Sequence, residues 1–128
     1  MDLPKNLKYN KDYSWVKIEK DIAVVGVIEP AAKKVKEFVF IKLPEKGKRI
    51  KQGDIYVSLE AVKWSGHLSS PVSGQIIEVN DKLFDEPSKI NKKPYESWIM
   101  KVRLDNPSEA KKLIDAKEAS VWIKQKIG

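Results

Sequence analysis

Apolar and polar residues alternate along most of this chain, and alternation of this kind predicts β-strands. It is clearest at Ile55, Val57, Leu59 and Ala61, which would share one face of a strand. Similar or β-branched runs recur elsewhere, and His67 to Ser70 also has an extended pattern. We expect strands at residues 13–19, 22–27, 38–43, 55–62, 75–80 and 98–104.

Helix signals are confined to two segments of the chain. Pro30 stands near the start of residues 29–36, and the alanines and lysines that follow predict one or two helical turns. Pro107 opens residues 107–126, where apolar residues recur at helical spacing. This pattern predicts a C-terminal helix at about residues 107–126.

Residues 81–96 separate the last two expected strands. They contain Pro87, Pro94 and charges of both signs, which predicts a long irregular connection. No linker divides the chain, and 128 residues suit one core. We therefore expect a mostly β fold in a single domain over residues 1–128.

Composition excludes several classes of chemistry. The chain has no cysteine and a single histidine, His67, so disulfides, thiolate metal sites and multi-imidazole zinc sites are excluded. We expect no metal. The sequence also carries no phosphate-binding glycine loop and no nucleophile elbow, so we do not expect an enzyme.

Charge and hydropathy bear on location and partners. The net charge is +7, and a basic excess lies between Lys33 and Lys51, which keeps a basic nucleic-acid-binding domain as a remote alternative. That stretch lacks interleaved aromatic residues, so we do not expect nucleic-acid binding. No apolar run is long enough for a membrane span, and Met1 to Lys5 does not open a secretory signal. We expect a cytoplasmic protein with no membrane contact.

Lys63 is the candidate functional residue. It follows the clearest strand, at the expected tip of a hairpin in which Gly66 would permit the tight turn. A lysine there is an exposed amine on a stiff support. By itself this position is also typical of an ordinary solvated lysine.

The residues around Lys63 resemble a known modification site. Glu60-Ala61-Val62-Lys63 and Ser70-Pro71-Val72-Ser73-Gly74 are similar to the lipoyl-attachment region of the glycine cleavage system H-protein family, which usually has Glu-Ser-Val-Lys-Ala and Ser-Pro-Val-Ser-Gly. The resemblance extends to Trp15-Val16, to Phe38 through Pro44 and to Asn91-x-x-Pro94-Tyr95. It covers nearly the whole chain.

The resemblance implies a fold and a function. The fold would be a flattened sandwich of two small antiparallel sheets, of the lipoyl- and biotinyl-carrier type. Lipoic acid would be attached covalently to Lys63 by a lipoate ligase or transferase, with Glu60 and Gly74 contributing to recognition for lipoylation. The protein would be a monomeric carrier that takes an aminomethyl group between glycine decarboxylase, aminomethyltransferase and dihydrolipoamide dehydrogenase.

The lipoyl group on its lysine forms a long arm, which in this family carries the aminomethyl group. This chain departs from the family at positions that contact that arm in family members. Tyr13-Ser14-Trp15 replaces the usual His-Glu-Trp, and His67 stands where an aspartate is common. Asp12 could supply the missing carboxylate, so we expect Asp12, Ser14 and His67 to contact the arm. Loss of carboxylates would weaken attraction to a cationic group by about 1 to 4 kcal/mol.

These departures keep a second pathway open. H-like lipoate-binding proteins serve heterodisulfide reductase-like enzymes of sulfur oxidation, where the arm carries sulfur intermediates. Such cargo would not need the missing carboxylate. The resemblance therefore implies a lipoyl carrier, with glycine cleavage and sulfur oxidation as alternative pathways.

Overall fold

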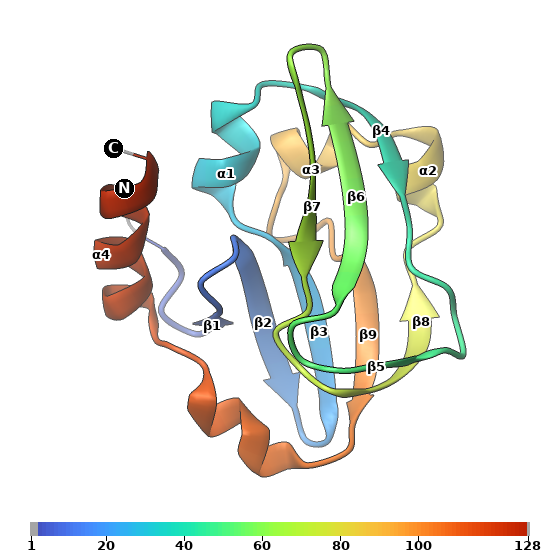
Figure 1. The fold of residues 1–128 in the computed structure, drawn as a ribbon, viewed down its shortest axis with the longest axis vertical. Helices are drawn as coiled ribbons and strands as arrows, with labels where there is room; N and C mark the ends of the chain where they lie inside the picture. Colours follow the sequence, from blue (N-terminus) through green and yellow to red (C-terminus); the bar gives the residue numbers. More distant parts are fainter. Residues whose placement is uncertain (1–2, 128) are drawn as a thin grey trace.

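The computed structural model describes residues 3–127 and consists of two antiparallel β-sheets with helices at their edges (Figure 1). The larger sheet has six strands in the order β1-β2-β3-β9-β8-β5, and the smaller has three in the order β4-β6-β7. Met1 and Asp2, part of the segment where we expected no secretory signal, lie outside the described residues, as does Gly128.

The strands of the larger sheet are β1 (Lys8–Tyr9), β2 (Ser14–Glu19), β3 (Ile22–Val27), β5 (Arg49–Ile50), β8 (Gly74–Val79) and β9 (Met100–Leu104). Those of the smaller sheet are β4 (Phe38–Lys42), β6 (Ile55–Ala61) and β7 (Trp64–Ser69). The helices are α1 (Glu29–Lys34), α2 (Lys82–Asp85), α3 (Lys89–Lys92), the 3-10 helix η1 (Pro107–Lys112) and α4 (Ala116–Ile127).

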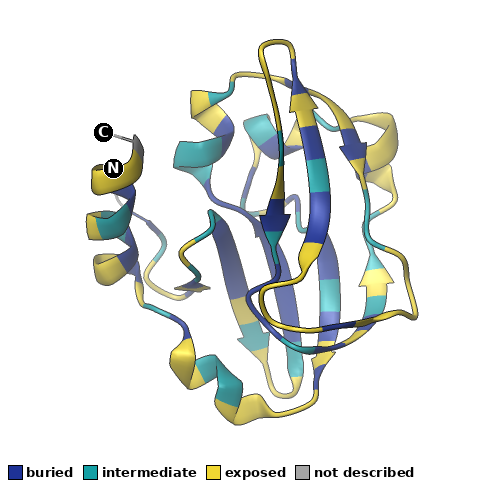
Figure 2. Cartoon of the chain, viewed as in Figure 1, coloured by how far each residue is buried: buried dark blue, intermediate teal, exposed yellow. Residues whose placement is uncertain are grey.

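The main core lies between the two sheets. Val16 and Val25 of the larger sheet and Ile41 and Leu59 of the smaller are at most 1% exposed and belong to one apolar cluster. Buried and exposed positions alternate along β9, as a strand with one face on this core requires (Figure 2). The structure confirms the predicted mostly β sandwich of two antiparallel sheets.

A second, smaller core covers the other face of the larger sheet. Trp15 and Val24 alternate with the residues of the main core along β2 and β3, so their side chains point to the opposite face. Ala119 and Ile123 of α4 pack there together with Leu7 of the N-terminal segment. The C-terminal helix therefore shields apolar surface that would otherwise face water.

The expectations for residues 81–96 and 107–126 were partly wrong. Short helices α2 and α3 occupy the connection that we expected to be irregular, and each buries one apolar side chain, Leu83 and Ile90. The C-terminal helix does not begin at Pro107. Residues 113–115 leave the helical path because Ile114 forms backbone hydrogen bonds with Tyr9, so α4 begins at Ala116.

The hairpin that carries Lys63 also differs from expectation. We expected the chain from Lys63 to Gly66 to interrupt the strand pattern, with Gly66 serving the turn. Instead β7 begins at Trp64, and Gly66 lies inside that strand opposite Leu59.

Candidate functional site

Lys63 stands in the turn between β6 and β7, at the upper end of the molecule in Figure 1. Ala61 pairs with Trp64, so only Val62 and Lys63 form the turn. Val62 is 83% exposed, and Lys63 is exposed as well. Within residues 3–127, no group forms a hydrogen bond or an ion pair with the Lys63 amine. The amine is therefore accessible on a short turn between two paired strands.

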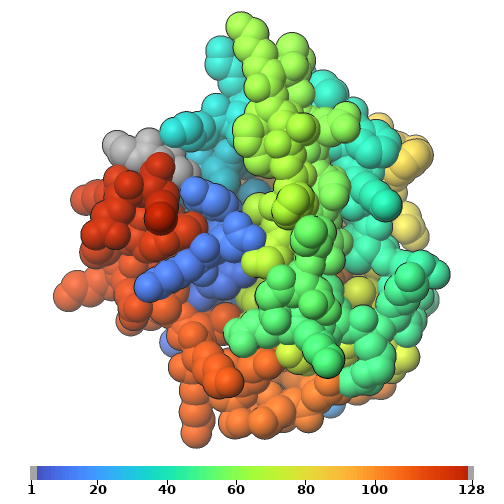
Figure 3. Space-filling model, in the orientation of Figure 1, coloured from blue at the N-terminus to red at the C-terminus, as the bar shows by residue number. Residues whose placement is uncertain are grey.

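A cleft of about 600 Å³ opens beside Lys63. It lies between the β6–β7 hairpin and the segment from Ala31 to Phe38, and the hairpin forms a ridge whose tip projects from the surface in Figure 3. Its apolar lining includes Val27, Val35, Phe38, Leu59, Trp64 and Leu68. An uncharged chain extending from Lys63 would find an apolar surface there.

The charged residues that line this cleft are mainly cations. They are Lys34, Lys36, Lys63 and Lys126, with Glu37 as the carboxylate among them. Cations outnumber carboxylates in this lining, so it favours a neutral or anionic group over a further cation.

Glu60 and His67 lie on the opposite face of the smaller sheet from the cleft. Leu59 and Ala61 face the core, so Glu60 between them points outward and is exposed. His67 pairs with Ser58 on that outer face and is also exposed. This register places His67 away from the cleft, and its expected contact with the arm stays a prediction. Glu60 is accessible to a partner that approaches the tip of the hairpin from the outer face of the smaller sheet.

Asp12 and Ser14 are held in hydrogen bonds of the fold. The Asp12 carboxylate accepts hydrogen bonds of 2.6 Å from the backbone N–H and the hydroxyl of Ser69, at the far end of β7 from Lys63. Ser14 is fully buried, and its hydroxyl lies 2.7 Å from the hydroxyl of Tyr56. Burial raises the pKa of Tyr56, so this hydroxyl stays protonated in neutral solution. In the structure the Ser14 hydroxyl thus contacts Tyr56, and the Asp12 carboxylate binds Ser69. The expected contacts of Asp12 and Ser14 with the arm stay predictions.

Gly74 lies near the base of the hairpin rather than at its tip. It is the first residue of β8, where it pairs with Ile50 and Leu104. A Cβ atom at this position would stand 2.0 Å from the carbonyl oxygen of Arg103, so only glycine allows the two strands this approach. The six-residue strand β7 separates the region of Gly74 from Lys63 by roughly 20 Å.

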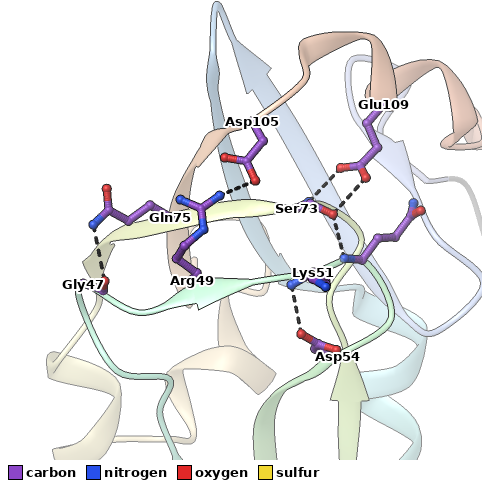
Figure 4. A network of polar contacts seen from close by, with 9 residues as sticks. Gly47, Arg49, Lys51, Asp54, Ser73, Gln75, Asp105 and Glu109 are labelled. Atoms are coloured by element: carbon purple, nitrogen blue, oxygen red, sulfur yellow. Dashed lines mark hydrogen bonds and ion pairs between the residues drawn. The ribbon is translucent and has the colours of Figure 1, made fainter.

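A polar network fastens the chain before Gly74 (Figure 4). The Glu109 carboxylate accepts hydrogen bonds from the backbone N–H of Ser73 at 2.7 Å and from its hydroxyl at 2.9 Å. The same hydroxyl accepts a hydrogen bond from the backbone N–H of Gln52 at 2.8 Å. An ion pair between Arg49 and Asp105 joins the same segments on the outside. The Ser-Pro-Val-Ser-Gly motif is therefore a clamped corner of the sheets, that is, a turn held by hydrogen bonds to Gln52 and Glu109.

Asn91 was not singled out as a site residue, yet it shapes one wall of the cleft. Its side-chain amide donates hydrogen bonds to the carbonyl oxygens of Ala32, at 2.8 Å, and Lys36. Its side-chain oxygen accepts a hydrogen bond of 2.8 Å from the backbone N–H of Phe38. These bonds hold the link between α1 and β4. The family resemblance already included Asn91-x-x-Pro94-Tyr95, so the sequence contained an indication that Asn91 is important.

Two other kinds of site are absent from the part of the chain that the structure describes. No three His, Cys, Asp or Glu side chains in residues 3–127 gather in a way that could hold a metal ion. No helix in that range is both long enough and apolar enough to cross a membrane.

Comparisons with known proteins agree with this geometry. The family model described as glycine cleavage H-protein matches residues 7–126. The glycine cleavage system H proteins of two Staphylococcus epidermidis strains are 39% and 38% identical over 124 residues, which covers 96% of this chain and 98% of theirs. The crystal structure of a glycine cleavage system H protein from Mycobacterium marinum superposes with a TM-score of 0.83 at 29% identity, covering 96% of this chain and 98% of that one. The chain therefore belongs to the glycine cleavage H-protein family, a family of lipoyl carriers.

Proposed function

We propose that this protein is the lipoyl carrier of a glycine cleavage system and that Lys63 is its attachment residue. The observation that carries the proposal is the exposed, unbonded Lys63 amine on a two-residue turn beside an apolar cleft. Membership in the family supports the kind of cofactor, and the matching motif around Lys63 supports the position.

The residues at the tip suit attachment of lipoic acid. Acylation would turn the Lys63 ammonium into an amide and remove one positive charge. When attached, the dithiolane supplies the redox-active sulfur pair that takes up and hands on an aminomethyl group. The paired strands β6 and β7 hold the residue to which the arm is attached. The apolar cleft offers the arm a surface between encounters with partner enzymes.

The protein's own part in this function is presentation. Glu60 is exposed on the outer face, three residues before Lys63, where a lipoate ligase or transferase can contact both. We expect glycine decarboxylase, aminomethyltransferase and dihydrolipoamide dehydrogenase to meet the loaded or reduced arm in turn in the cytoplasm, with this protein itself non-catalytic. The sulfur-oxidation and nucleic-acid alternatives receive no support from the comparisons.

Intact mass spectrometry tests the attachment. The protein is incubated with lipoate ligase, ATP and lipoate, and we expect the mass of one lipoyl group to be added at Lys63. Lys63→Arg should abolish the gain and leave the free energy of unfolding within about 0.5 kcal/mol of wild type, since the side chain contacts no core. Lys42→Arg, an exposed lysine on the outer face of the same sheet, is the matched control and should be modified normally.

A second measurement tests the pathway. Lipoylated protein is mixed with glycine decarboxylase, pyridoxal phosphate and glycine, and aminomethylation of the arm is followed by mass. Efficient transfer supports the glycine cleavage role. A wild-type protein that stays unmodified while the same ligase modifies another carrier would overturn the proposed attachment, and a lipoylated protein inert with glycine decarboxylase would overturn the pathway.

A further inference from the structure

Two phenylalanine side chains are exposed at the edge of the smaller sheet, where α2 packs beside β4 (Figure 1). Phe40 of β4 is 44% exposed and Phe84 of α2 is 61% exposed, and their ring centroids lie 6.3 Å apart at an interplanar angle of 73°. Phe38 and Ile41 of the same strand are buried, so β4 contributes to the core without Phe40. Exposed aromatic rings in contact with each other are typical of a surface that binds another protein.

The two rings lie on the same side of the smaller sheet as Glu60. Phe40 pairs with Glu60 across the sheet, and both are exposed on its outer face. Glu60 is three residues before Lys63, which places the Cα of Phe40 within roughly 15 Å of the Cα of that lysine. A standard interface covers about 800 Å² on each partner, a patch roughly 30 Å across. A partner that contacts the Lys63 turn from outside would therefore also cover Phe40 and Phe84.

The short helix α2 presents carboxylates beside the ring of Phe84. The burial of Leu83 fixes how this helix is turned, and at about 100° per residue Asp81 and Asp85 lie on its solvent-facing side. Lys82 lies on the side of the helix away from Phe84. Neither aspartate forms an ion pair within residues 3–127. The helix therefore adds negative charge next to the exposed ring.

The outer face of the smaller sheet thus differs in charge from the cleft face. We call the surface formed by these side chains the outer strip, and it consists of Phe40, Glu60, Asp81, Phe84 and Asp85. Its three carboxylates have one lysine near them on the same face, Lys42 of β4. The lining of the cleft is instead mainly cationic, and the whole chain has a net charge of +7. The outer strip is therefore an apolar and acidic surface on a basic protein.

The enzyme that acylates Lys63 is the partner that has to come closest to this surface. Before attachment the reacting atom is the lysine Nζ itself, so the active site has to reach the turn, whereas enzymes that act on the far end of the arm do not. The acyl donor of a ligase is an adenylate: Nζ loses a proton and forms the amide, and the bond between the acyl carbon and the phosphate oxygen breaks. Enzymes hold such phosphates with arginine and lysine. These cations would be attracted by the outer strip and repelled by the cleft lining.

We propose that the outer strip is the docking surface for the lipoate ligase that modifies Lys63. The two phenylalanine rings enter an apolar pocket of the ligase, and basic side chains around that pocket face the three carboxylates. The inference rests on the proposed attachment of lipoic acid to Lys63. It extends recognition from Glu60 alone to a surface formed by β4, β6 and α2.

The kinetics of lipoylation by lipoate ligase, with ATP and lipoate, test the apolar contact. Phe84→Ala should raise the KM for this protein about tenfold and leave kcat within about twofold, because the ring contacts the ligase and not the reacting atoms. Phe40→Ala should raise the KM in the same direction. Val121→Ala is the matched control, since Val121 is 55% exposed on α4, and it should leave the KM unchanged. A wild-type KM in Phe84→Ala overturns the proposal.

A pair of charge reversals tests the electrostatic contact. Asp85→Lys and Glu118→Lys change the net charge of the protein by the same amount, but only Asp85 belongs to the outer strip. Asp85→Lys should raise the KM for lipoylation about fivefold at low salt, and this difference should shrink at high salt. Glu118→Lys should follow the wild type. Equal KM values for the two variants would overturn the proposed charge complementarity.

Photocrosslinking tests the contact without relying on kinetics. The photoreactive residue p-benzoylphenylalanine is placed at Phe84 in one variant and at Val121 in another, and each is irradiated with the ligase. We expect a crosslink to the ligase from position 84 only, and no crosslink there, or equal crosslinking from both positions, overturns the proposal. If the wild-type protein gains no lipoyl group while the same ligase modifies another carrier, the proposed attachment itself fails. If the wild-type protein is lipoylated and the Phe84 and Asp85 variants behave like it, only the docking surface fails.

Discussion

The two ends of the β6–β7 hairpin are built in opposite ways. At the tip, Val62 and Lys63 are exposed, and Lys63 forms no hydrogen bond or ion pair within residues 3–127. At the base, Asp12 binds Ser69 through two short hydrogen bonds. The backbone N–H of Ser70 also donates a hydrogen bond of 2.7 Å to the carbonyl oxygen of Asp54 there. One end of the hairpin is open to solvent and the other is fastened to several segments.

This difference fits the proposed carrier function. A modified amine must be accessible, which requires few local contacts around Lys63. Accessibility alone would leave the tip mobile, because exposed turns lose little by fraying. The contacts at the base restrict the motion of the turn, because the paired strands β6 and β7 connect the turn to the base. Stability should therefore depend on the base, and modification on the tip.

Gly74→Ala should have the largest effect on stability. Its Cβ would clash with the Arg103 carbonyl at 2.0 Å, and the strands β8 and β9 would have to separate. We expect a loss of about 3 kcal/mol in the free energy of unfolding, measured by urea denaturation. Gln75→Ala, on the exposed neighbour, is the matched control and should cost less than about 0.5 kcal/mol.

The same variant tests the expected role of Gly74 in lipoylation. Because the length of β7, roughly 20 Å, separates the region of Gly74 from Lys63, folded Gly74→Ala protein at low temperature should be lipoylated at the wild-type rate. A strongly reduced rate in folded protein would instead assign Gly74 to the surface that the lipoylating enzyme recognises. A wild-type melting profile would contradict the clamped corner.

Asp12→Ala should weaken the base to a smaller degree. It removes a carboxylate that accepts two hydrogen bonds from Ser69 and leaves the Ser69 N–H without its partner. We expect a loss of about 1.5 kcal/mol, because Asp12 is half-buried and its bonds involve a charged acceptor. Hydrogen exchange at the Ser69 amide should accelerate accordingly. Lys11→Ala, the exposed neighbour, should leave both measurements unchanged; equal exchange in both variants would show that Asp12 does not fasten the hairpin.

The strands of the hairpin could be predicted from the sequence only in part. Alternation from Ile55 to Ala61 correctly predicted that β6 is a strand. It placed Ile55 on the wrong face, because a register shift between Ile55 and Val57 leaves Ile55 exposed and buries Tyr56. The start of β7 was missed because Gly66 is typical of a break in a strand, whereas in the structure the absence of a Cβ at Gly66 leaves room for the indole of Trp64. That contact depends on how two residues of one strand share a face, which composition alone does not reveal.

The candidate site was predictable at Lys63 and much less so around it. Lys63 was found through the motif that surrounds it, and the structure places it on the expected hairpin tip. The burial of Ser14 could not be predicted, because it depends on Tyr56, which is distant in sequence. The face on which His67 lies depends on the strand register, which the sequence pattern did not specify for this strand. Asn91 acts through three backbone contacts that local pattern cannot predict.

Glu60→Gln should have the smallest effect on stability. It should distinguish most clearly the role of the tip in lipoylation from the role of the base in stability. Glu60 is exposed on the outer face and forms no ion pair within the described residues, so the free energy of unfolding should change by less than about 0.5 kcal/mol. A lipoylating enzyme that contacts this carboxylate would lose a charged interaction worth about 1 kcal/mol, which is about fivefold in the rate of lipoylation at low protein concentration. Glu118→Gln, an exposed glutamate of α4, is the control and should be modified at the wild-type rate. Equal rates for both variants would remove Glu60 from the recognition surface, and recognition would then depend on the shape of the turn at Val62 and Lys63.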